Sequence, residues 1–377
     1  MPSVTADLVD SLLDADFRRQ ALGFESSLLS LRVKPATSLL FSYRDQGGQV
    51  GWLRVLWPEG QKKARKHEQA AKAAGLQVLT RPFPTSWGNR FAAFSLQAGP
   101  LEADPKLLGH GGLDLLSLPS CRVLRYNPAR RLVLAYRGEQ EGPMRVVRLL
   151  AGGRVQDTAL YGRLAPYLPV PDLLPADQLS GLRALAFVGD RDLSTGQVPE
   201  EAAAAGALFA RLHDLDPGAF SDLPLGAGSW GSEQLLVHAR LFEALDLGLA
   251  ERCRALAARL PAVQGPNRLL HGDASADQVL LEGSGAAGRY WLTDFDRAAL
   301  GPVAVDLGSY LALSSPEAGA AFLEGYQAGG GRLPEAEQLA LGLSHALALR
   351  VAEPLRKARP SWRQDVDLML RRLEELV

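Results

Sequence analysis

The 377-residue sequence is poor in cysteine: it has only Cys121 and Cys253, and no CxxC pair. Two isolated thiols supply neither a disulfide framework nor a cysteine-ligated zinc site, which fits a reducing compartment. The chain also lacks a basic excess, because 41 Lys and Arg residues face 42 Asp and Glu residues. A protein that binds nucleic acid usually carries such an excess, so we expect no DNA or RNA partner.

Long apolar runs are missing as well. No stretch of about 18 uncharged apolar residues occurs, as a membrane-spanning helix would require. Residues 1–7 lack the basic region and the apolar run of a signal peptide. We therefore expect a cytoplasmic protein with no membrane association, and its length predicts two or three domains with their own cores.

The chain contains an internal repeat. Residues 31–44 align with residues 124–137, at an offset of 93 positions. Seven residues of the first stretch have identical partners in the second: Leu31, Arg32, Pro35, Ala36, Leu39, Tyr43 and Arg44. With one residue inserted, Arg54 falls on Arg148. Repeats at such a spacing indicate duplicated structural units.

We interpret residues of about 20–100 as a degenerate copy of residues of about 113–193. Each copy predicts two strands around a turn, then a helical segment and a final strand. The strands are expected at residues 39–43, 51–57 and 91–96 in the first copy and at 132–136, 144–150 and 185–188 in the second.

Beyond residue 188 the composition becomes typical of helices. An alanine-rich segment, 202–213, follows Pro199-Glu200-Glu201, which is a helix-start pattern. Further helices are expected at 233–245, 249–260, 316–327, 335–356 and 362–377, interrupted by a hairpin of strands 278–281 and 290–293. The sequence thus predicts an α+β protein with a cap (residues 1–110), a small β-rich lobe (111–189) and a large helical lobe (190–377).

The residues that suggest chemistry lie around this hairpin. His271-Gly272-Asp273 is followed by Gln278, and Asp294-Phe295-Asp296 comes after the second strand. Asp273 follows a glycine in a loop, where its carboxylate can approach a substrate hydroxyl. The hairpin should bring Gln278 and Asp294 side by side. A base with two oxygen ligands around one cleft suits magnesium-assisted phosphoryl transfer.

This segment resembles the aminoglycoside-phosphotransferase-like kinases, which are relatives of protein kinases. Their pattern is H-G-D-x-x-x-x-N, then D-[FW]-[DE], then D-L-[AG], and the last element here is Asp306-Leu307-Gly308. The resemblance implies a protein-kinase-like two-lobe fold that uses ATP and Mg2+. It also implies that Asp273 is the catalytic base, that Gln278 and Asp294 hold magnesium, and that Asp306 braces the catalytic loop.

Two departures from that pattern bear on the substrate. Gln278 replaces the usual Asn, as it also does in the maltokinase and glucosamine-kinase branch, which carries an N-terminal cap. The second His of that branch is Ser275 here, and Arg297 follows Asp294-Phe295-Asp296 in place of a G-E-P segment. The resemblance implies a small hydroxylated acceptor, a sugar or amino sugar first, with aminoglycosides and choline-like alcohols next.

The small lobe supplies the candidate nucleotide residues. Strand alternation puts Val146 and Arg148 on one face. By the resemblance, Val146 lines the adenine pocket, and Arg148 meets the α- and β-phosphates where the family usually has Lys. Asp157 is the nearest candidate partner for Arg148 in sequence. Phe187 lies in the segment expected to contact the adenine edge.

The turn before strand 132–136 lacks a G-x-G-x-x-G pattern, and its cations Arg130 and Arg131 are the candidates for phosphate contact. No second H-G-D loop accompanies the first copy, so we expect a cap without catalysis. We interpret His271 as a packed structural residue, because no G-x-S-x-G elbow supports a hydrolase. The alternative function is a nucleotide-binding pseudokinase that acts through its cap.

Overall fold

The computed structural model describes residues 4–83, 91–138, 142–152, 158–176, 182–196, 198–226 and 231–377. The chain begins with two short helices, α1 (Val4–Leu13) and α2 (Ala15–Leu22), packed near a first antiparallel sheet. The sheet has the strand order β1-β2-β3-β5-β4. Its strands are β1 (Ser26–Lys34), β2 (Ser38–Asp45), β3 (Val50–Leu56), β4 (Leu79–Pro82) and β5 (Ser95–Pro100), with helix α3 (Gln61–Ala73) between β3 and β4.

A second sheet repeats this plan. Its order is β6-β7-β8-β10-β9, so each strand takes the place that the strand with a number five lower takes in the first sheet. Its strands are β6 (Arg122–Asn127), β7 (Arg131–Arg137), β8 (Met144–Leu150), β9 (Leu173–Leu174) and β10 (Ala184–Ala186), and the short helix α4 (Ala159–Leu164) follows β8. In both first turns an alanine has a left-handed backbone: φ is 53° at Ala36 and 54° at Ala129. These alanines are partners in the sequence repeat, so the duplication extends to a backbone conformation that non-glycine residues rarely adopt.

The final strands of both copies are placed differently from the sequence prediction. The first copy's strand, expected at residues 91–96, is β5 (Ser95–Pro100), and the second copy's is the shorter β10 (Ala184–Ala186). Phe91 and Phe94 are buried, but Phe94 N donates to Phe91 O in a tight turn. Apolar residues in that segment therefore fill the core from a turn and not from a strand.

The second half of the chain is mostly helical, as predicted. Its helices are α5 (Pro199–Asp214), α6 (Gly231–Phe242), α7 (Leu247–Arg259), α8 (Ala304–Leu311), α9 (Pro316–Ala328), α10 (Ala336–Arg350), α11 (Glu353–Arg356) and α12 (Trp362–Leu376). The helix expected at 335–356 is divided into α10 and α11, because Pro354 has no N–H to continue the ladder of hydrogen bonds. Within the described residues, no helix is both long and apolar enough to span a bilayer.

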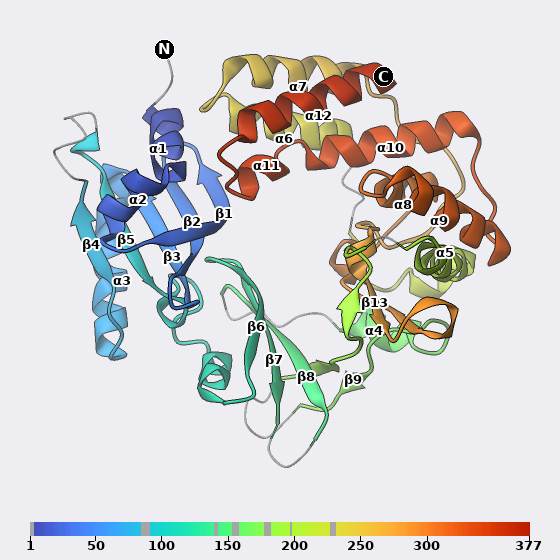
Figure 1. The fold of residues 1–377 in the computed structure, drawn as a ribbon, viewed down its shortest axis with the longest axis horizontal. Helices are drawn as coiled ribbons and strands as arrows, with labels where there is room; N and C mark the ends of the chain where they lie inside the picture. Colours follow the sequence, from blue (N-terminus) through green and yellow to red (C-terminus); the bar gives the residue numbers. More distant parts are fainter. Residues whose placement is uncertain are drawn as a thin grey trace.

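Three hydrophobic clusters hold these parts together. Leu40 and Trp52, on one face of the first sheet, join Leu132, Leu134 and other residues of the second sheet in one cluster. The opposite face of the first sheet shares a second cluster with α6, α7, α10 and α12. A third cluster fills the helical half around α5 and α9. Figure 1 shows the resulting arrangement, in which the second sheet has the first sheet on one side and β13 and α4 on the other, and α11 comes beside β1.

Candidate active site

The loop that carries Asp273 follows strand β12 (Arg268–Leu270). The side chain of Asp306, on α8, anchors this loop. Asp306 is fully buried and accepts hydrogen bonds from His271 N at 2.6 Å and Gly272 N at 2.9 Å. His213 Nε2 of α5 hydrogen-bonds the same carboxylate at 3.1 Å. Asp306 therefore braces the loop that carries Asp273, as expected.

The electrostatics of Asp306 favour its ionised form. Burial by itself raises the pKa of a carboxyl, but the hydrogen bond and charge of His213, with help from His271, lower the pKa of Asp306 below its ordinary value. The carboxylate can therefore serve as a permanent acceptor for the loop's N–H groups.

Gly272 has to be glycine in this loop. Its φ is +77°, and a Cβ there would come within 2.0 Å of Arg297 O. The position therefore needs both the left-handed backbone and the missing side chain. His271 packs beside it, with its ring centroid 4.7 Å from that of Phe295, and its Nε2 donates to Thr293 O at 2.7 Å. The interpretation of His271 as a structural residue is confirmed, and its bond ties the Asp273 loop to the segment before Asp294.

The hairpin forms where the sequence predicts it. Strands β13 (Val279–Glu282) and β14 (Arg289–Leu292) pair antiparallel, and Thr293 N donates to Gln278 O at 3.0 Å. Gln278 precedes the strand in a 3-10 turn and is buried. The register therefore places the backbone of Gln278 opposite the residue that precedes Asp294.

Asp294 is held at a turn of unusual backbone geometry. Its φ is 61° and ψ is 52°, in the left-handed region. Asp294 N donates to the hydroxyl of Tyr161 at 2.9 Å, and Tyr161 packs edge-on against Phe295. Tyr161 lies on α4, and no motif in the sequence singled it out. Its hydrogen bond links the second sheet's helix to the candidate metal ligand.

Arg148 of β8 reaches across to this turn. Its Nη2 lies 2.9 Å from Asp294 Oδ1, and its Nη1 forms an ion pair with Asp296. Arg131 Nη1 contacts Asp296 Oδ2 at 3.1 Å. Burial alone raises the pKa of Asp294, but the charge and hydrogen bond of Arg148, followed by the charge of Arg131, lower it. Burial by itself lowers the pKa of Arg148, because it disfavours the charged guanidinium. The carboxylates of Asp294 and Asp296 outweigh burial and raise this pKa.

The two candidate phosphate-binding arginines diverge. Arg131 lies with Arg148 at Asp296, whereas Arg130 is exposed and its charge acts on Arg32 of β1 and on Arg356 of α11. The other expected partner of Arg148, Asp157, lies outside the described residues.

Strand β8 has the alternation expected of it. Val147 and Leu149 are buried in the cluster between the sheets, so Val146 and Arg148 face the other way. Val146 pairs with Leu185 of β10. Phe187 is 37% exposed, and its N–H donates to Met144 O at 2.9 Å. These residues thus line the side of the second sheet that faces the helical half.

The residue types predicted as metal ligands suit magnesium. Mg2+ is commonly bound through one or two carboxylates together with substrate phosphates, and the amide oxygen of Gln278 is a donor of the same hard kind. In the ranges that the structure describes, no three or more His, Cys, Asp or Glu residues gather as a metal-binding group. A closed protein cage, as in a structural zinc site, is therefore not present in those ranges.

Arg54, the counterpart of Arg148 in the first sheet, has different surroundings. Arg54 donates a hydrogen bond to the amide oxygen of Gln97, whereas Arg148 donates to a carboxylate, that of Asp294. Burial lowers the pKa of Arg54 to about 10. A cap without catalysis stays a prediction, and this exchange of carboxylate for amide supports it.

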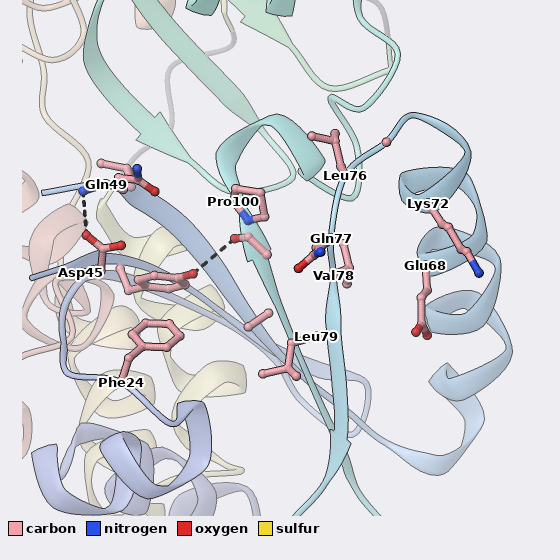
Figure 2. Close-up of a pocket in the computed structure, with 15 residues that line it drawn as sticks. Phe24, Asp45, Gln49, Glu68, Lys72, Leu76, Gln77, Val78, Leu79 and Pro100 are labelled. Carbon is pink, nitrogen blue, oxygen red and sulfur yellow. Dashed lines mark hydrogen bonds between the residues drawn. The ribbon is translucent and has the colours of Figure 1, made fainter. Parts of the chain in front are cut away.

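A cavity of about 720 Å³ lies in the first sheet's region, between its strand ends and α3. Figure 2 shows Phe24 and Leu79 on one side of it and Glu68 and Lys72 of α3 on the other. None of the predicted catalytic, metal or nucleotide residues lines it. The candidate active site is therefore assigned from its chemistry and not from this hollow.

Asp273 has two arginine neighbours that the sequence did not bring to attention. Arg297 Nη1 lies 3.1 Å and Arg350 Nη2 3.6 Å from Asp273 Oδ1. Arg297 was visible only as a departure from the D-F-E-G-E-P segment. Arg350, at the end of α10, has no local pattern that could have linked it to Asp273.

A comparison with protein families identifies the family of this chain. The model of the phosphotransferase enzyme family matches residues 125–341, which is more than half of the chain. The chain belongs to that family. The match begins within β6, after the first sheet, and contains the rest of the second sheet, the Asp273 loop, the hairpin and Asp306. The expected family is confirmed: this chain is a member of the phosphotransferase enzyme family.

Several solved structures are similar to this phosphotransferase. A macrolide 2'-phosphotransferase from Brachybacterium faecium is 21% identical and covers 67% of this chain and 92% of its own, with a TM-score of 0.45. A choline/ethanolamine kinase family protein from Mesorhizobium loti is 16% identical, covering 70% of this chain and 92% of its own, with a TM-score of 0.47. A spectinomycin phosphotransferase, solved with ADP and spectinomycin, is 14% identical, covering 68% and 91%, with a TM-score of 0.46. No curated protein matches the sequence.

Proposed function

We propose that this phosphotransferase moves the γ-phosphate of ATP, with Mg2+, to a hydroxyl of a small molecule. The observation that carries the proposal is the bond from His271 Nε2 to Thr293 O, 2.7 Å long. It joins the loop of Asp273 to the segment that ends in Asp294. One rigid unit thereby holds a candidate base and a candidate metal ligand, and Arg148 of the second sheet reaches the same unit at Asp294.

Asp273 acts on the acceptor. Its carboxylate accepts the proton of the attacking hydroxyl, while the hydroxyl oxygen forms a bond to the γ-phosphorus and the bond to the β,γ-bridging oxygen breaks. Asp306 holds the N–H groups of His271 and Gly272, so the base is positioned before substrate arrives. Preorganisation of this kind avoids a reorganisation cost during the reaction.

Arg148 and Arg131 supply fixed positive charge for the phosphates that are not transferred. Arg148 is largely buried, with 10% of its side chain exposed, so its charge is less screened than that of a surface residue. Asp294 and Gln278 would hold the Mg2+ ion, which neutralises charge on the phosphate oxygens. Val146 and Phe187 would contact the adenine.

The proposal extends to the chemical class of the phosphate acceptor. Sugars and amino sugars are the first class, as the sequence suggests, and aminoglycosides and amino alcohols are the next. Within these classes, the arginines beside Asp273 disfavour the cationic members, which are the amino sugars, the aminoglycosides and the amino alcohols.

The test is Mg2+-dependent ADP release by the wild type and by Asp273→Asn, across a panel of sugars, amino sugars, aminoglycosides and amino alcohols. Loss of general-base catalysis typically costs about 10²- to 10⁴-fold in rate, so we expect turnover to fall by at least about 100-fold while ADP affinity is kept. Asp222→Asn is the matched control, because Asp222 makes an exposed ion pair with Arg163 on the same half of the chain.

Two other outcomes count against the proposal. Tight binding of Mg·ATP without turnover of any acceptor would favour the pseudokinase. A wild-type protein that binds no nucleotide would overturn the proposal altogether.

A further inference from the structure

The immediate surroundings of Asp273 are strongly cationic. Arg297 and Arg350 both approach its Oδ1 atom, at 3.1 Å and 3.6 Å. The Arg297 side chain is 57% exposed, whereas that of Arg350 is only 6% exposed. A hydroxyl that hydrogen-bonds Asp273 would therefore lie within a few ångströms of two guanidinium groups.

Arg350 has unused hydrogen-bonding capacity. Its Nε is buried and has no hydrogen-bond partner in the described part of the chain, and its contact with Glu353 is a longer ion pair of 3.8 Å. Buried polar groups are nearly always hydrogen-bonded in folded proteins. A buried guanidinium that is held only by long ion pairs is suited to receive another anion.

Three more arginines extend this positive region. Arg356 of α11 is exposed, yet its pKa is lowered, first by the desolvation that surrounding protein imposes and then by the charges of Arg297 and Arg130. The pKa of Arg32 in β1 is lowered by burial and by the charge of Arg130.

The arginine cluster thus consists of Arg32, Arg130, Arg297, Arg350 and Arg356. Asp273 pairs with Arg297 and Arg350, and Glu353 pairs with Arg350 and acts on Arg356. Lys357 also pairs with Glu353, at 3.3 Å, so this carboxylate is shared among several cations. Positive charge is therefore in excess beside the candidate base.

We propose that the acceptor is an anion: a hydroxylated small molecule with a carboxylate or phosphate group, which Arg297, Arg350 and Arg356 bind beside Asp273. This inference rests on the proposed phosphotransferase function. Guanidinium groups bind carboxylate and phosphate oxygens with paired N–H donors, so the cluster matches either group. A cationic acceptor, such as an amino sugar or an aminoglycoside, would be repelled by the same charges.

The proposal also gives the cap a part in the reaction. Arg356 lies on α11, and α11 packs against β1, the strand that carries Arg32. The first sheet thereby helps to position α11 and adds a charge at the outer edge of the cluster. The cap then acts as one wall of the acceptor site, although it holds no catalytic loop.

The first test measures binding of an anion without any chemistry. Inorganic phosphate, and acetate in a parallel series, are titrated by calorimetry into wild-type protein saturated with Mg·ADP, so that the nucleotide site is filled. Losing a charged hydrogen bond weakens binding by about 10-fold or more. We expect that loss in Arg297→Gln and in Arg356→Gln. The control Arg359→Gln, which removes an exposed arginine paired with Asp365, should bind as the wild type does.

The second test compares acceptors of one carbon skeleton and different charge: glucose, glucosamine, glucuronate and glucose 6-phosphate. ADP release should be fastest with glucuronate or glucose 6-phosphate, and which of the two is faster identifies carboxylate or phosphate as the recognised group. Faster turnover of glucosamine, or equal anion affinity in the wild type and both variants, would overturn the inference while leaving the kinase intact. A protein that does not bind Mg·ADP would instead refute the proposed function, and the anion titration without nucleotide still tests the cluster.

Discussion

Asp306→Asn is the substitution that tests most directly how the catalytic loop is held. Three donors converge on the Asp306 carboxylate: His271 N, Gly272 N and His213 Nε2, at 2.6, 2.9 and 3.1 Å. An asparagine amide keeps one oxygen acceptor and turns an NH2 group toward the remaining donors. Each buried donor left unsatisfied costs about 1–3 kcal/mol, so one or two of them predict a loss of about 2–4 kcal/mol.

The pH dependence of this loss follows from the lowered pKa of Asp306. Its ionised form stabilises the fold fully above the unfolded pKa of about 3.9, and that contribution disappears as the pH falls through the lower folded value. The difference in unfolding free energy between the wild type and Asp306→Asn should therefore be constant from about pH 8 to pH 5 and shrink below about pH 4.

Urea unfolding at several pH values measures this difference, and steady-state kinetics provide a second readout. As a positioning residue, Asp306 should affect kcat more than the KM for ATP. Asp222→Asn is the control, since exposed ion pairs contribute less than about 1 kcal/mol. A loss of under about 0.5 kcal/mol in Asp306→Asn, or a difference that fades between pH 8 and pH 6, would refute the reasoning.

Three further predictions concern single positions. Gly272→Ala should lower the unfolding free energy by at least about 1–2 kcal/mol in a urea titration, because φ is +77° there, and an unchanged value would contradict the strained geometry. Arg148→Gln should raise the pKa of Asp294, because the main charge that opposes burial is removed, and a carboxyl NMR titration that finds this pKa unchanged would disprove the assigned role of Arg148. In Cys121→Ser the remaining thiol, Cys253, is buried with its pKa raised to about 12, so a disulfide reagent at pH 8 should label it only at the rate of unfolding, and rapid labelling would contradict its burial.

The sequence predicted much of the architecture because its signals are local or repeated. The duplication was readable from identities at one spacing, and the two sheets carry it through to equal strand orders and to the left-handed Ala36 and Ala129. The hairpin after the Asp273 loop was predicted from two β-rich runs around a glycine-rich turn, and it pairs as expected. Boundaries were less predictable, because Phe91 and Phe94 have strand-like hydrophobicity but pack from a turn.

The residues of the candidate site also fall into two groups: those that a local sequence pattern predicts and those that only the folded chain brings together. The candidate base, the candidate metal ligands and Asp306 lie close together in one motif, so the sequence alone could predict them as a site. The partners of these residues come from distant segments: Tyr161 from α4, Arg131 and Arg148 from the second sheet, and Arg350 from the end of α10.

Only the tertiary structure decided the charges around Asp273. Arg32, Arg130, Arg297, Arg350 and Arg356 are spread along most of the chain, and no periodicity or spacing connects them. Packing of α11 against β1, and of the second sheet against the helical half, places their charges in one region. The sequence by itself predicted the class of reaction, because the residues of the motif that resembles a known kinase family lie close together in the chain. The charge of the acceptor depends on side chains that meet only when the whole chain has folded.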